Sequence, residues 1–388
     1  MLEGNFVEKR EKLAKDPIFQ TYLFYFLIQT TAVFYVGDLH SQWKYLESQI
    51  GFIVLPLVLC STTHVDENSI KKIMRFFNIL IASACTYCLI VSFIAYLHTN
   101  NTEILFYHHL VSPLGHHAVY FSVFVFFNLL YLLLRLNWKQ LSHFSLIFQS
   151  CLVGYYFVFL ILLSSKLILI IIFVFLLASI VRYILSNTQK WKAFAILFIL
   201  VLIFTAIISI DNPVKERFNN IRKANLTQLL DKKYNPGTSF TGADFRLLLW
   251  RLTYEILRDK HSLITGVGPT NSQPFLKAKY LSLNMYAGGQ KPGDQGFLSY
   301  NCHNQFLQSW LQSGLLGVFS LFFWNIIWIR KIQQRKDLML YGIMLTLFAF
   351  LFTESVFMRQ YGMVLYTVFP LLFFYGGKKA TVIPDGTS

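Results

Sequence analysis

The residues best suited to acid–base chemistry in this sequence are His303 and Asn304. They directly precede an apolar stretch, so Asn304 could cap a helix that starts there and His303 would lie at its positive end. That position favours a neutral imidazole, which can accept a proton from a hydroxyl group. We therefore predict that His303 is a general base. An interfacial histidine satisfied by water is the alternative.

Two arginines, Arg217 and Arg246, lie in the same polar segment of the chain as His303. The planar guanidinium binds a phosphate group through two parallel hydrogen bonds, which a lysine ammonium cannot reproduce. A single arginine near a membrane is more often a headgroup contact or a surface charge. Two arginines close in sequence to a candidate base favour a site for a phosphate-bearing substrate.

Between these residues lie a predicted helix and a group of glycines. Apolar residues recur at spacings of three and four, as on one face of a helix: Phe245, Leu248, Leu249, Leu252 and Ile256. Arg246 and Trp250 fall on another face, so the helix could lie along the membrane surface with Arg246 facing a cavity. Gly266 and Gly268 begin a series of glycines that marks turns, so we expect the rest of this segment to be irregular.

Four more polar residues lie near the predicted ends of apolar stretches. Lys166 could extend to the membrane interface or add positive charge to the same site. His116 is followed by a second histidine, but a third metal ligand is missing from this region, so we expect no metal. For Glu354 and Arg359 the simplest expectation is an ion pair with each other across a short turn.

Composition assigns the chain to membrane proteins. Its 388 residues are 55% hydrophobic and only 14% charged, and the mean hydropathy is +0.49. Soluble domains carry about a quarter charged residues. The apolar stretches are continuous, without the alternation of barrel strands. The first seventeen residues are charged and lack a cleavage pattern, so we expect no signal peptide.

We predict an all-α integral membrane protein with about ten transmembrane helices and one long periplasmic loop that bears short helices. The predicted spans are 18–36, 50–63, 74–97, 117–136, 143–163, 167–186, 193–210, 305–329, 338–353 and 361–376. They divide the chain into a bundle of seven spans (1–210), the loop (211–304), a group of three spans (305–376) and a tail (377–388).

The distribution of basic residues predicts the orientation in the membrane. With a cytoplasmic N-terminus, eighteen Lys and Arg residues lie on the inside and three lie in short outside segments, and such a bias sets topology. The remaining thirteen lie in the loop 211–304 with seven acidic residues, a net charge of +6. Both termini are then cytoplasmic. A positive outer loop suggests an anionic partner, and basic residues spread over membrane loops argue against nucleic acid.

These residues, in this order, resemble the O-antigen ligase and polymerase superfamily of bacterial envelopes. The resemblance rests on Asp244-Phe-Arg246-x-x-x-Trp250, Gly266-x-Gly268, and His303-Asn304-Gln-Phe-Leu followed by Gly314-x-x-Gly317. Ser164-Ser165-Lys166 and the segment 352–360, which contains Glu354 and Arg359, resemble two further motifs. The likeness covers roughly residues 105–376.

The resemblance implies a glycosyltransferase of the GT-C type in the bacterial inner membrane. It uses no nucleotide sugar, metal or other cofactor, and its donor is a glycan on undecaprenyl diphosphate. Carried over to this chain, Arg217 and Arg246 bind the diphosphate and His303 serves the acceptor hydroxyl, with direct displacement and inversion at the anomeric carbon. We expect the remaining candidates to bind substrate: Lys166, Asn304, Trp250, Gly266, Gly268, His116, Glu354 and Arg359.

The acceptor is left open by the sequence. Lipid A–core would make the chain an O-antigen ligase, a second lipid-linked glycan would make it a polymerase, and a protein hydroxyl would make it a protein O-oligosaccharyltransferase. A transporter or flippase for an anionic lipid is the alternative from another class. Against transport, the ionisable Arg182 and Glu354 lie near the ends of predicted spans rather than at their centres.

Overall fold

The computed structural model describes residues 4–34, 39–62, 65–186, 227–289 and 294–376, and between them positions 215 and 219. In these ranges every regular element is an α-helix or a short 3-10 helix. The chain divides into two compact units. The first contains residues 1–73 and most of the chain from 225 onwards, and the second contains residues 74–224 with 241–243.

The first unit is built around one long helix. Its helices outside the long loop are α1 (Phe6–Lys15), α2 (Pro17–Phe34), α3 (Leu39–Gln49), α4 (Gly51–Ser61), α14 (Gln305–Arg335), α15 (Leu338–Thr353) and α16 (Gln360–Gly376). Helix α14 packs along α2 and α15, while α16 packs against α4 and α15. Buried aromatic residues fill the contacts, and the hydroxyl of Tyr22 donates a 2.6 Å hydrogen bond to the carbonyl of Tyr366.

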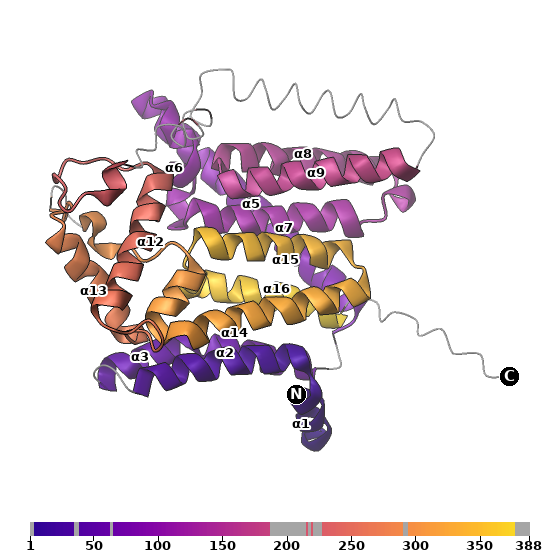
Figure 1. The fold of residues 1–388 in the computed structure, drawn as a ribbon. Helices are drawn as coiled ribbons and strands as arrows, with labels where there is room; N and C mark the ends of the chain where they lie inside the picture. Colours follow the sequence, from indigo (N-terminus) through magenta and orange to yellow (C-terminus); the bar gives the residue numbers. More distant parts are fainter. Residues whose placement is uncertain are drawn as a thin grey trace. The chain divides into compact units, whose positions relative to one another are not determined.

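The long loop contributes a small helical layer to the same unit. It consists of η4 (Thr227–Leu230), α12 (Gly242–Asp259), α13 (Pro269–Ser282) and η5 (Gly296–Ser299). Figure 1 shows α12 and α13 gathered near the N-terminal end of α14. All five apolar residues predicted to share one face of α12 are buried, together with Leu276 and Tyr280 of α13. That face therefore packs against protein rather than against the membrane surface.

Helix α13 corrects the prediction that the loop after α12 is irregular. Gly268 precedes the helix and Pro269 is its first residue, which is a favourable helix start because proline lacks an N–H that the first turn cannot use. Lys279 of α13 forms a 2.9 Å ion pair with Glu255 of α12. Burial would raise the pKa of Glu255, but Lys279 and Arg251 outweigh it and hold that pKa below its usual value. The ion pair between Lys279 and Glu255 therefore links α13 to α12.

The second unit surrounds a buried helix. It contains most of α5 (Glu67–Thr99), together with α6 (Tyr107–Val111), α7 (Ala118–Arg135), α8 (His143–Leu163) and α9 (Lys166–Ser186). Helix α7 packs against α6, α8 and α9. Its Asn128 donates a 2.9 Å hydrogen bond to the side chain of Asn78 in α5, and the hydroxyl of Tyr156 in α8 donates to the carbonyl of Asn78. This polar contact ties three apolar helices together.

Helices form at nine of the ten predicted spans, and the seventh, 193–210, falls outside the described ranges. Within those ranges five helices are long and apolar enough to cross a bilayer: His40–Ser61, Glu67–Thr99, Ala118–Arg135, His143–Leu163 and Gln305–Arg335. Two shorter apolar helices are Lys166–Ala178 and Leu338–Thr353. The part of the chain that is described is an α-helical membrane protein, while the total of ten spans stays a prediction.

Candidate active site

Three ionisable side chains from distant parts of the sequence meet in the first unit. Arg246 extends from the first turns of α12, His303 lies just before α14, and Glu354 directly follows α15. Arg246 Nη2 lies 3.0 Å from Glu354 Oε1, and His303 Nδ1 lies 3.0 Å from Glu354 Oε2. One carboxylate thus holds a guanidinium on one oxygen and an imidazole on the other.

The same arrangement orients the arginine through the protein backbone. Arg246 Nε donates a 3.1 Å hydrogen bond to the carbonyl oxygen of Thr353, the last residue of α15. The Glu354 side chain is only 7% exposed, whereas that of Arg246 is 33% exposed. A buried carboxylate needs compensating charge, and Arg246 supplies it while its guanidinium remains within reach of a ligand.

The imidazole of His303 has a defined direction. An ionised carboxylate only accepts hydrogen bonds, so the contact with Glu354 places a proton on Nδ1 and leaves the lone pair of a neutral ring on Nε2. The backbone of His303 is in the left-handed region with φ of 44°, and its N–H donates a 3.0 Å hydrogen bond to the side chain of Asn301. The turn fixes the backbone and the contact with Glu354 orients the ring, so Nε2 is the nitrogen that can accept a proton.

Asn304 has a structural function in this geometry. Its side-chain oxygen accepts a 3.1 Å hydrogen bond from the N–H of Leu307, which confirms the predicted cap of α14. Its amide nitrogen donates to the carbonyl of Phe352, and its backbone N–H donates to the hydroxyl of Ser355, both at 3.4 Å. These bonds join the start of α14 to the end of α15. The predicted substrate contact of Asn304 remains a prediction.

Two buried glutamines of α14 form hydrogen bonds with residues close in sequence to His303 and Glu354, and the sequence did not point to them. The side-chain oxygen of Gln305 accepts a 2.8 Å hydrogen bond from the backbone N–H of Phe357. That of Gln308 accepts a 3.3 Å bond from the N–H of Cys302 and lies 3.5 Å from the hydroxyl of Ser355. Buried glutamines spaced three apart on an otherwise apolar helix are the signal that could have indicated these hydrogen bonds, because buried amides need partners.

The predicted Gly-x-Gly motif lies against a break in α14. Gly314 leaves helical geometry, with φ of 66° and ψ of −155°. Nearby, the N–H of Val267 donates a 2.7 Å hydrogen bond to the carbonyl of Leu311, and that of Gly268 donates a 3.1 Å bond to Gln312. The segment 264–268 thus satisfies carbonyl groups that the break leaves without helical partners. This is a packing function for the motif, and a contact with substrate stays a prediction.

The close approach at this break requires glycine. A Cβ on Gly266 would lie 2.5 Å from the backbone nitrogen of Gly314, and one on Gly314 would overlap the carbonyl group of Ile264. Neither contact can relax by moving a side chain, because the opposing atoms are backbone. The start of α14, which includes the cap at Asn304, is positioned by this contact with the loop.

We therefore expect Gly314→Ala to destabilise the protein by about 2–5 kcal/mol, through overpacking and a backbone conformation that only glycine adopts readily. The measurement is the thermal unfolding midpoint of the purified protein in detergent. Gly154→Ala is the matched control, because Gly154 lies within helix α8 with nothing near its Cβ position. An unchanged midpoint for Gly314→Ala would contradict the packing function of this glycine.

Two neighbours of the site have defined surroundings. Cys302 is completely buried, and burial raises the pKa of its thiol to about 12. A neutral thiol is a poor nucleophile, so the residue beside His303 is unsuited to covalent catalysis. Trp250 lies against the buried core of the loop layer, and its indole nitrogen is buried without a hydrogen-bond partner among the residues described.

The other predicted residues lie in the second unit, after the end of α15 or outside the described ranges, and their contribution to this cluster stays a prediction. Lys166 and His116 belong to the second unit, and burial lowers the pKa of His116. Arg359 is exposed and follows η6 (Val356–Met358). Among the described residues, Glu354 forms its ion pairs with Arg246 and His303 and not with Arg359. Arg217 lies outside the described ranges, so its place in the site stays a prediction.

In the residues with described coordinates, no three His, Cys, Asp or Glu side chains come together as a metal-binding group. The metal-independent mechanism expected from the sequence remains a prediction.

The apolar helices and the buried ionisable cluster define a membrane protein with one concentrated polar site. Residues 151–322 match the family model described as O-antigen ligase. This confirms the resemblance to the O-antigen ligase and polymerase superfamily, and it supports a multi-pass bacterial membrane glycosyltransferase of that type. The matched region includes Arg246 and His303 but ends before Glu354. The search of curated proteins finds no match to this chain.

Proposed function

We propose that this protein transfers a glycan from undecaprenyl diphosphate to a hydroxyl of lipid A–core on the periplasmic side of the inner membrane, as an O-antigen ligase. The observation that supports the proposal is the shared carboxylate of Glu354, which holds Arg246 and His303 on its two oxygens. The reaction needs a cation for the leaving diphosphate and a base for the attacking hydroxyl. This cluster offers both groups in a fixed arrangement.

Arg246 is assigned to the leaving group. When the bond between the anomeric carbon and the diphosphate breaks, its electron pair stays on the phosphate oxygen, and a fixed cation stabilises that charge. The guanidinium is held by Glu354 and Thr353 and is one-third exposed, so it needs little reorganisation when substrate binds. Arg217 is proposed as a second cation for the same diphosphate.

His303 is assigned to the acceptor. The acceptor hydroxyl oxygen attacks the anomeric carbon from the face opposite the diphosphate, and its proton passes to Nε2 of His303. The imidazolium that forms is stabilised by Glu354, which remains ionised and bound to Nδ1–H. A single displacement of this kind inverts the anomeric carbon. The proton and the leaving electron pair are both accounted for without a metal ion.

The proposal is tested by transfer assays on purified protein with lipid-linked glycan as donor and lipid A–core as acceptor. Arg246→Ala should lower transfer by about 10- to 100-fold, because a charge-assisted hydrogen bond contributes about 1.5–3 kcal/mol. Arg246→Lys should recover only part of the activity, since an ammonium cannot bind phosphate oxygens with the same planar geometry.

Arg258→Ala is the matched control, because Arg258 is an exposed arginine in the last turn of the same helix. It should retain full transfer activity. Replacing lipid A–core with a second lipid-linked glycan tests the polymerase alternative. If wild-type protein moves labelled lipid across vesicles but forms no glycosidic product with any acceptor, the chain is a transporter and the proposed reaction is wrong.

A further inference from the structure

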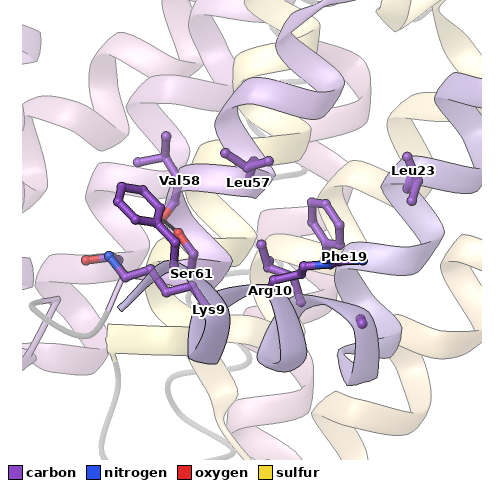
Figure 2. A pocket seen from close by; sticks show the side chains of 11 residues that line it. Lys9, Arg10, Phe19, Leu23, Leu57, Val58 and Ser61 are labelled. Atoms are coloured by element: carbon purple, nitrogen blue, oxygen red, sulfur yellow. Dashed lines mark hydrogen bonds between the residues drawn. The ribbon is translucent and has the colours of Figure 1, made fainter. Parts of the chain in front are cut away.

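The first unit contains a cavity of about 750 Å³ where α1 crosses α2 and α4. Figure 2 shows the side chains that line it, including Lys9 and Arg10 from α1 and Leu57 and Val58 from α4. Its full lining is Phe6, Lys9, Arg10, Leu13, Ala14, Phe19, Leu23, Leu57, Val58, Ser61 and Thr62. We call it the α1 cavity.

The lining of the α1 cavity combines apolar walls with two cations. Helices α2 and α4 supply apolar side chains such as Phe19 and Leu57, and Lys9 and Arg10 are the charged residues of the lining. Among the described residues that line it, none is acidic, although α1 itself also carries Glu8 and Glu11. The complementary ligand has an anionic head and an extended apolar chain.

This cavity is distinct from the cluster of Arg246, His303 and Glu354. It is lined by the N-terminal part of α2, including Phe19 and Leu23. Further along α2, Gln29 accepts a 2.8 Å hydrogen bond from the hydroxyl of Ser313, next to the break in α14. Ten residues of helix separate Phe19 from Gln29, about 15 Å at 1.5 Å per residue. The cavity and the break in α14 therefore contact opposite ends of α2, and none of the three cluster residues is among the described residues that line the cavity.

Lys9 and Arg10 belong to the basic residues that predict a cytoplasmic N-terminus, which places the α1 cavity at the inner leaflet. Basic pockets between helices on that side recognise anionic lipid headgroups. The apolar walls of the cavity are also suited to an acyl chain.

We propose that the α1 cavity binds an anionic phospholipid of the cytoplasmic leaflet. The headgroup phosphate contacts Lys9 and Arg10, and one acyl chain lies along Phe19, Leu23 and Leu57. This site is separate from the site that binds the donor lipid in the proposed reaction. A lipid bound in the α1 cavity holds α1 against α2 and α4. The interaction is independent of glycan transfer.

Native mass spectrometry of the delipidated full-length protein, titrated with phosphatidylglycerol or phosphatidylcholine, tests the proposal. Wild-type protein should retain one phosphatidylglycerol in preference to phosphatidylcholine. The double variant Lys9→Gln/Arg10→Gln should lose at least about tenfold in phosphatidylglycerol affinity, because each basic residue near an anionic headgroup contributes to binding. Val58→Trp, which fills the apolar wall, should weaken both lipids.

Lys71→Gln/Lys72→Gln is the control, since it removes the same charge from exposed positions outside the cavity. It should leave the preference for phosphatidylglycerol unchanged. Equal binding of the two lipids by wild-type protein overturns the proposal, as does an equal loss in the control variant. Unchanged affinity in both Lys9→Gln/Arg10→Gln and Val58→Trp would also overturn it.

Discussion

Replacing His303 by Ala is expected to slow glycan transfer by about 10²–10⁴-fold, the usual contribution of a general base. Binding of the lipid-linked donor should persist, because the base acts on the acceptor hydroxyl and the diphosphate is held by arginine. The measurement is single-turnover transfer at saturating acceptor, together with direct binding of labelled donor. A loss of turnover without a loss of donor binding distinguishes the proposed base from a residue that only shapes the site.

The backbone at His303 requires a second variant. The backbone of residue 303 has a φ of 44°. This left-handed conformation costs an alanine about 1–2 kcal/mol, whereas asparagine adopts it more readily. His303→Asn should therefore fold normally and still lose turnover. His261→Asn is the control, because His261 is an exposed histidine of the same loop with φ of 52°. If His303→Asn transfers glycan at the wild-type rate, His303 is an interfacial histidine and the base assignment fails.

The sequence predicted the parts of this site that depend on local patterns. The spacing of apolar residues predicted α12 and the residues of its apolar face, although that face packs against protein and not along the membrane surface. The position of Asn304 before an apolar stretch predicted the cap of α14. Both features are decided by residues within one or two turns of helix. The cap and the face are sufficient to place His303 and Arg246 on their elements, but not to place them beside each other.

The partner of both residues could not be predicted from spacing. Glu354 is separated from Arg246 by 108 positions and from His303 by 51. The nearest opposite charge in sequence, Arg359, suggested a local ion pair instead. Burial explains why Glu354 pairs with these distant residues, because a carboxylate that packing removes from water is stable only when cations form hydrogen bonds with it. That need becomes visible only when the end of α15 is seen packed against the start of α14.

The break in α14 was missed for a related reason. Gly314 and Gly266 are both common turn signals, and neither indicates that their backbones touch. The prediction of a ligand contact at Gly266 and Gly268 came from the resemblance alone. Helix α13 was not predicted, because the surrounding glycines and the polar composition favoured an irregular loop. Its start at Gly268-Pro269 is nevertheless a recognisable helix signal.

Glu354→Gln is expected to lower transfer by about 10²–10⁴-fold, close to the effect of removing the base itself. An amide has one oxygen and one NH₂ group in place of two equivalent acceptors. Arg246 can only donate, so the amide oxygen should turn to Arg246 and the NH₂ group to His303. The NH₂ group then donates to Nδ1, which moves the ring proton to Nε2 and removes the lone pair that should accept the acceptor proton.

The tautomer provides a readout that a purely structural role would not change. Selective ¹⁵N-histidine NMR of the purified protein should show a proton on Nδ1 of His303 in the wild type and on Nε2 in Glu354→Gln. Donor binding should be retained, because Arg246 keeps its hydrogen-bond acceptor. Glu354→Asp preserves the charge with a shorter side chain, so it should keep the wild-type tautomer and lose less activity than the Gln variant. If Glu354→Gln keeps the proton on Nδ1 and the wild-type rate, the carboxylate does not position the base. Its contact with His303 would then contribute to packing alone.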